Sequence, residues 1–132
     1  MLNRTQIAAY AQAMRESDPR LDGTLASLAV LDALLAQYRE ALFAEGDDEP
    51  TMAIGLLAGA YFGEVLLTAA GGDWRFSDEG YMPSLAGPGC EVSPFGRVQK
   101  FFAEGPDDDL SSLASAYVSF NALAEQLEVG SV

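Results

Sequence analysis

The chain has 132 residues, 49% of them apolar and 20% charged, and its 20 acidic residues against 7 basic ones give a net charge of −13 at pH 7. This composition is that of a globular protein, and the length predicts one acidic, mainly helical domain over residues 1–132. Because Lys and Arg neutralise phosphates, so acidic a chain is a poor binder of nucleic acid or of a membrane with anionic headgroups. We expect a basic protein as partner, although a charge that serves only solubility is the alternative.

The absence of histidine and the single cysteine limit the enzyme chemistry that is open to this chain. The chain has no histidine, which excludes Ser-His-Asp and Cys-His nucleophiles and imidazole bases within one protomer. Its only cysteine is Cys90, so it has no intramolecular disulfide, no Cys-x-x-Cys pair and no thiolate zinc site. We therefore expect a protein that is not an enzyme, with no catalytic residue, no metal and no cofactor. The lone cysteine and an N-terminus without a signal-peptide pattern indicate the cytoplasm.

Two amphipathic helices are expected in the first third of the chain. The first has apolar residues at three- and four-residue spacing, is capped by Asn3 or Thr5, and ends before the breaker Ser17-Asp18-Pro19. The second begins after residues 21–24 and runs to about Phe43. Its expected buried stripe comprises Leu28, Leu31, Leu35, Tyr38 and Leu42.

Residues 52–70 form the most apolar stretch and carry Glu64 as their only charge. The stretch is long enough to span a bilayer, but a carboxylate near its middle and acidic flanks without Lys or Arg favour the central helix of a packed core. We expect Glu64 to form an ion pair with Arg75, Arg97 or Lys100. The alternative is an unpaired Glu64 that acts as a general acid or base.

Gly55, Gly59 and Gly63 fall four residues apart and line one stripe of the same helix. A glycine in a helix interior costs about 1 kcal/mol relative to alanine, so some interaction must offset it. Close packing of the second or the fifth helix is one explanation, and the seam of a homodimer is the other.

Residues 73–92 are expected to form a hairpin or three short antiparallel strands, because β-favouring aromatic residues alternate with turn residues there. Trp74 and Tyr81, flanked by Asp78 and Glu79, make an aromatic anchor beside acids, which is typical of a surface that binds a basic partner. The alternative is that Trp74 folds back onto the preceding helix and fills the core.

Two further helices complete the chain. Ser93-Pro94 starts the fourth, and Asp107, Asp108 and Asp109 open the fifth. We expect these three acids to belong to the partner-binding surface, and they lack the spacing of a calcium loop. The buried stripe expected for the fifth helix is Leu110, Leu113, Tyr117, Phe120, Ala124 and Leu127.

Several short motifs resemble a family of small uncharacterised bacterial proteins. They are Gly59-Ala60-Tyr61-Phe62-Gly63-Glu64-Val65, Gly71-Gly72-Asp73-Trp74, Val92-Ser93-Pro94-Phe95-Gly96-Arg97-Val98 and Glu104-Gly105-Pro106-Asp107-Asp108. The resemblance spans about residues 51 to 118. It implies a helix, a short β-excursion and a second helix, and it implies no catalytic residue.

Together these patterns predict a mainly α (α+β) fold of about five helices around a central apolar helix, with a small antiparallel excursion near residues 73–92. For function we expect a cytoplasmic protein-binding module, of the immunity or regulatory kind, that blocks a basic toxin or effector by charge complementarity. Two alternatives stay open. One is a small-molecule binder or carboxylate-dependent enzyme that uses Glu64 in a cleft between the helices and the hairpin, and the other is a structural homodimer subunit.

Overall fold

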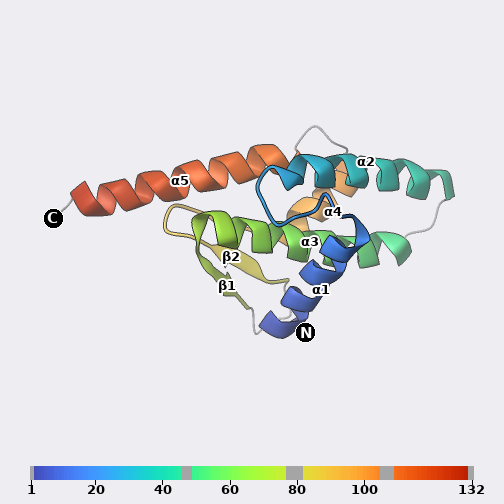
Figure 1. The fold of residues 1–132 in the computed structure, drawn as a ribbon, viewed down its shortest axis with the longest axis horizontal. Coiled ribbons are helices and arrows are strands. Elements are labelled where there is room, and N and C mark those ends of the chain that lie inside the picture. Colours follow the sequence, from blue (N-terminus) through green and yellow to red (C-terminus); the bar gives the residue numbers. More distant parts are fainter. Residues whose placement is uncertain (1, 46–48, 77–81, 105–108, 131–132) are drawn as a thin grey trace.

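The computed structural model describes residues 2–45, 49–76, 82–104 and 109–130. Within these ranges the chain forms five helices and one small antiparallel sheet, which confirms the mainly helical α+β fold (Figure 1). The elements are α1 (Arg4–Ser17), α2 (Ser27–Glu45), α3 (Glu49–Ala70), β1 (Asp73–Arg75), β2 (Ser84–Ala86), β3 (Glu91–Val92), α4 (Pro94–Glu104) and α5 (Leu110–Gly130).

Helix α3 is the centre of the fold, and α1, α2, α4 and α5 all pack against it (Figure 1). Its stretch Ala53–Ala70 is long and apolar enough to cross a membrane by length and composition alone. In the structure the large side chains of Tyr61, Phe62 and Leu66 are buried against the rest of the chain. This packing agrees with the interpretation of the segment as a core helix.

Helix α1 begins with the capping that its sequence predicts. The Asn3 side chain accepts a hydrogen bond from the Gln6 backbone N–H at 2.9 Å, and the Gln6 side chain accepts one from the Asn3 N–H at 3.0 Å. This reciprocal pair satisfies two backbone donors that a helix start leaves free. The helix then lies on α3 through Ile7, Ala11 and Met14, all of which are buried.

The three strands form an antiparallel sheet in the order β1-β2-β3, as the sequence predicts. Trp74 pairs with Leu85 and Leu85 pairs with Val92, so these side chains share one face of the sheet. Trp74 and Leu85 are buried, and that face packs towards α3 and α4.

Two of the three stripe glycines of α3 are covered by side chains of the same chain. A Cβ on Gly59 would lie 2.5 Å from the Phe95 ring of α4, and a Cβ on Gly63 would lie 2.2 Å from the Trp74 ring of β1. The expectation that α2 or α5 packs here is therefore wrong, because α4 and β1 occupy the stripe. The same two contacts leave no room at Gly59 and Gly63 for a homodimer seam.

Helix α5 is held at its start by two acids. Asp32 of α2 accepts hydrogen bonds from the Leu110 N–H at 2.8 Å and from the Ser111 hydroxyl at 2.7 Å, and Asp109 accepts one from the Ser112 N–H at 2.7 Å. These carboxylates satisfy backbone donors at the positive end of the helix dipole.

The buried stripe of α5 differs from the expected one. Leu110, Ala114, Tyr117 and Asn121 are buried, whereas Phe120 is 55% exposed. The rotation of the helix follows from the turn between β2 and β3, because the Asn121 side chain accepts a hydrogen bond from the Gly89 N–H at 2.9 Å. Asn121 thus takes the inward position that the apolar pattern assigned to its neighbour.

Candidate functional site

The expected aromatic anchor at the hairpin is partly wrong, because Trp74 belongs to the core. Its side chain is only 9% exposed, and its ring centroid lies 6.0 Å from that of Phe95. Gly63 makes this position possible, since any larger residue there would meet the indole ring. Trp74 therefore holds the sheet to α3 and cannot project towards a partner.

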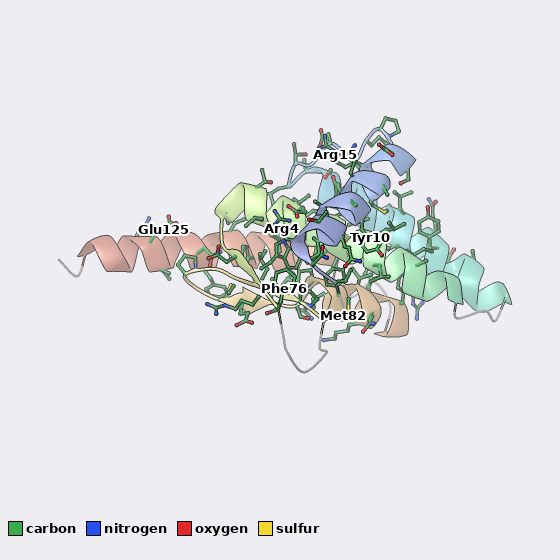
Figure 2. The ribbon with its side chains drawn as sticks, turned by 90° about the horizontal axis from the view of Figure 1, so that it is seen from below. Arg4, Tyr10, Arg15, Phe76, Met82 and Glu125 are labelled. Carbon is green, nitrogen blue, oxygen red and sulfur yellow. The ribbon has the colours of Figure 1, made fainter. Side chains whose placement is uncertain are left out.

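The hairpin does expose two other large apolar residues, Phe76 at 44% and Met82 at 39%. The strand register pairs Arg75, the last residue of β1, with Ser84, the first residue of β2. Phe76 comes just after Arg75 and Met82 two residues before Ser84, so both lie beyond the same end of the β1–β2 ladder. Figure 2 labels both side chains at this end of the sheet. We call Phe76 and Met82 the hairpin patch.

The hairpin patch lies on either side of an acidic stretch of sequence. Asp78, Glu79 and Tyr81 stand between its two residues and fall outside the described part of the chain. The exposure of Phe76 could have been inferred from the sequence. Phe76 stands two residues after Trp74, so strand alternation places the two side chains on one face. Phe76 is nearer the turn and therefore extends past the core residues that bury Trp74.

Of the three acids expected before α5, only Asp109 is described, while Asp107 and Asp108 fall outside the described residues. Hydrogen bonds from the Ser112 side chain and backbone lower the pKa of Asp109 below its usual value. This carboxylate is therefore engaged in capping α5, so its structural role is shown and a role in partner binding stays a prediction.

Glu64 forms an ion pair with Arg4 of α1, which donates to both carboxylate oxygens. The expected pairing is confirmed, but the expected cations Arg75, Arg97 and Lys100 are wrong. The reason is a long-range one, because the start of α1 crosses α3 at the level of Glu64. The Glu64 side chain is 22% exposed and that of Arg4 is 51% exposed, so the pair lies at the protein surface.

A hollow of about 200 Å³ lies beside Glu64, between α1 and α3. This hollow differs from the cleft that the sequence predicts between the helices and the hairpin, which stays a prediction. The polar residues at this hollow are Gln12, Arg15, Tyr61, Glu64 and Thr68. The Tyr61 hydroxyl is already engaged, because it contacts the Ser27 hydroxyl at 2.6 Å and accepts from the Gly23 N–H at 3.0 Å.

Other chemistry-bearing groups are few in the part of the chain that the structure describes. No group of three or more acidic, cysteine or histidine side chains gathers there in a way that could hold a metal ion. Cys90 is a free, half-buried thiol, and burial raises its pKa. A raised pKa reduces the thiolate fraction and so the reactivity of this cysteine.

Comparison of the chain with protein-family models, with curated proteins and with solved structures gave no match. The resemblance to a family of small bacterial proteins therefore stays a prediction.

Proposed function

We propose that this protein is a protein-binding module that occupies a basic site on another protein, as an immunity or regulatory protein does. The observation that supports this proposal is the hairpin patch, in which Phe76 and Met82 are exposed beside an acidic stretch of a chain with a net charge of −13. The interaction needs both parts of this arrangement. The apolar side chains give contact area, and the acids select the partner.

The apolar part supplies most of the binding free energy. A large side chain that is fully buried on binding contributes roughly 1.5–3 kcal/mol, and anchors of this kind dominate the energetics of protein interfaces. Phe76 directly follows β1 and Met82 lies two residues before β2, and β1 is held in place by Trp74, which packs on Gly63 and Phe95. A rigid support lowers the entropy that the patch loses on binding.

The charged part determines which partner is attracted. Among the cations, Arg4 and Arg20 are paired with Glu64 and Asp18, and Arg39 and Lys100 also have interaction partners. The acids outnumber the cations by 20 to 7, so the field around the molecule is negative. Such a field raises the association rate of a basic protein and opposes the approach of a phosphate backbone.

The test is a pull-down from the source organism with the tagged chain at low and at high salt. We expect a basic protein to be recovered in stoichiometric amount at low salt, and its recovery to fall with added salt and in a Phe76→Ala/Met82→Ala variant. A Leu25→Ala variant is the control, because Leu25 is 38% exposed and lies far along the chain from the hairpin. Equal recovery of the partner with the wild type, the Phe76→Ala/Met82→Ala variant and the Leu25→Ala control would reject the hairpin patch as the binding site.

A second candidate function is favoured by the hollow beside Glu64. Its volume of about 200 Å³ and its Gln12, Arg15 and Thr68 side chains suit a small polar ligand. The matched test is Glu64→Gln, which removes a surface ion pair that contributes about 0–1 kcal/mol and so leaves the melting temperature nearly unchanged. Loss of a small molecule that co-purifies with the wild type, at unchanged stability, would favour this function over protein binding.

A further inference from the structure

The C-terminal half of α5 projects beyond the rest of the molecule (Figure 1). The start of the helix is anchored by Asp32, and its middle is anchored where the turn between β2 and β3 meets it. At this last anchor a Cβ on Gly89 would lie 2.2 Å from the Phe120 carbonyl oxygen, so turn and helix are in direct contact. Beyond Asn121 the helix continues to Gly130.

The projecting part carries an exposed apolar face. Phe120 is 55% exposed and Leu123 is 51% exposed, the highest values among the large apolar side chains that the structure describes. The two residues are three positions apart and therefore lie on one face of the helix. We call Phe120 and Leu123 the helix patch. It is a separate surface from the hairpin patch.

A helix end of this length does not gain its stability from the backbone alone. Isolated helices shorter than about 12–15 residues are marginal in water, and most helical stability in proteins comes from packing of an apolar face. Residues 122–130 continue the helix beyond Asn121, which is the last buried residue of α5 among the side chains that the structure describes. The exposed face is thus suited to packing against another molecule.

The charge of α5 distinguishes between a second copy and another protein. The helix contains Glu125 and Glu128 and has no Lys or Arg over its whole length. Its C-terminal end also carries the negative pole of the helix dipole, which a cation stabilises. A second copy of the chain would bring a further net charge of −13 and another α5 without any Lys or Arg, so the two copies would repel each other. A basic protein would bring the complementary positive charge.

We propose that the end of α5 docks as an amphipathic helix into an apolar groove, rimmed by Lys or Arg, on a basic partner protein. Phe120 and Leu123 fill the groove, in the manner of helix-in-groove recognition, and the negative charge of a helix without any Lys or Arg favours the basic rim. This inference rests on the proposed function, and it assigns the partner a groove in addition to a basic surface.

The experiment uses the full chain and a defined probe. The probe is a dye-labelled synthetic helix with leucine along one face and lysine elsewhere, which combines the apolar surface and positive charge expected at the groove, and binding is followed by fluorescence anisotropy. We expect a Phe120→Glu/Leu123→Glu variant to bind the probe at least about tenfold more weakly than the wild type, a loss of about 1.4 kcal/mol. A probe of the same pattern with glutamate in place of lysine should not bind.

The control variant is Leu25→Glu/Tyr38→Glu, which adds the same charge at two residues outside α5 that are 38% and 37% exposed. We expect it to bind the lysine probe nearly as well as the wild type. Added negative charge by itself would strengthen the binding of a cationic probe, so equal weakening by both variants would mean that the loss is not specific to the helix patch and would overturn the inference. No binding by the wild type would overturn it as well.

Two further outcomes separate the inference from the proposed function. If the helix-patch variant still binds the probe fully and Phe76→Glu/Met82→Glu does not, the inference fails and a basic partner at the hairpin patch still stands. If the wild type sediments as a dimer that Phe120→Glu/Leu123→Glu converts to a monomer, the helix patch binds a second copy and the inference is wrong. Should the double variant unfold, Leu123→Glu alone gives the same comparison, because Leu123 lies beyond the last anchored residue of α5.

Discussion

Gly63 and Trp74 show how a single missing side chain determines the local architecture. The indole ring occupies the space where a Cβ would be, 2.2 Å from its nearest ring atom, and Pro94 lies 3.3 Å from the same point. Since the nearest atoms belong to a rigid ring in the core, the ring has to move if any larger residue replaces the glycine. The glycine at position 63 lowers the stability of the helix, and the burial of Trp74 offsets this loss.

Gly63→Ala is therefore expected to destabilise the protein, whereas Gly55→Ala is not. The added methyl group at position 63 forces the indole ring out of place, at a cost of about 1–3 kcal/mol. At position 55 nothing lies within 4 Å of the new Cβ, so alanine should stabilise the helix by up to about 1 kcal/mol. Urea denaturation of both variants measures the difference, and equal free energies of unfolding would contradict this account.

Asp18 gives a residue-scale prediction for acid stability. Hydrogen bonds from the Arg20 side chain and backbone lower the pKa of Asp18 from 3.8 to about 2. Because the folded pKa lies below the unfolded one, the contribution of the carboxylate is present above about pH 3.8 and is lost as the pH falls towards about 2. The stability difference between the wild type and Asp18→Asn should thus shrink over this window in acid denaturation. A difference that stays constant across the window would mean that the carboxylate is not the titrating group.

At this scale the sequence predicted interactions between near neighbours and missed those between distant residues. Asn3 was one of two expected caps and is the one observed, because the capping partner Gln6 lies three residues away. Glu64 was expected to be paired, but its partner Arg4 is sixty positions distant and no local pattern identifies it. The choice between core and surface for Trp74 depended in the same way on the position of α4.

At the scale of elements, α5 is joined to the rest of the fold through Asp32. The Asp32 carboxylate, on α2, accepts hydrogen bonds from two successive backbone N–H groups of α5 and from the Ser111 hydroxyl. These groups are part-buried, so they would otherwise lack full hydration. One side chain thus caps a helix and ties two distant parts of the chain together.

Replacing Asp32 by alanine should cost about 1–2 kcal/mol, the usual range for loss of a helix cap. Asp32→Asn retains one acceptor oxygen and should lose less. Glu40→Ala, at an exposed position of the same helix, serves as the control and should change stability by less than about 0.5 kcal/mol. Thermal unfolding gives the three values, and a result in which Asp32→Ala matches Glu40→Ala would show that the cap contributes nothing.

The element types and their order could be predicted from the sequence, because apolar periodicity and breaker residues are local signals. All five helices and the three strands occur where they were expected, with shifts at the ends such as the start of α3 at Glu49. The rotation of α5 about its own axis could not be predicted in this way. It depends on the turn between β2 and β3, which pulls the polar Asn121 inward and leaves Phe120 in solvent.

At the scale of the whole molecule, a strongly negative chain encloses a core centred on α3, and its four most exposed large apolar side chains among the described residues form the hairpin patch and the helix patch. Of these four residues, Phe120 was expected in the buried stripe of the fifth helix, and Phe76 and Met82 were expected within the β-excursion of residues 73–92. Composition predicted the sign of the partner's charge, but only the packed structure shows which apolar residues remain free to meet it. A binding site for a basic partner therefore stays a prediction, and the structure adds which apolar side chains are exposed.

The most direct test of this account is titration calorimetry of the chain with the protein that it captures at low salt. The account predicts a basic partner whose binding weakens as salt is raised and weakens by at least about tenfold in the Phe76→Ala/Met82→Ala variant. Binding that is insensitive both to salt and to this substitution would contradict it.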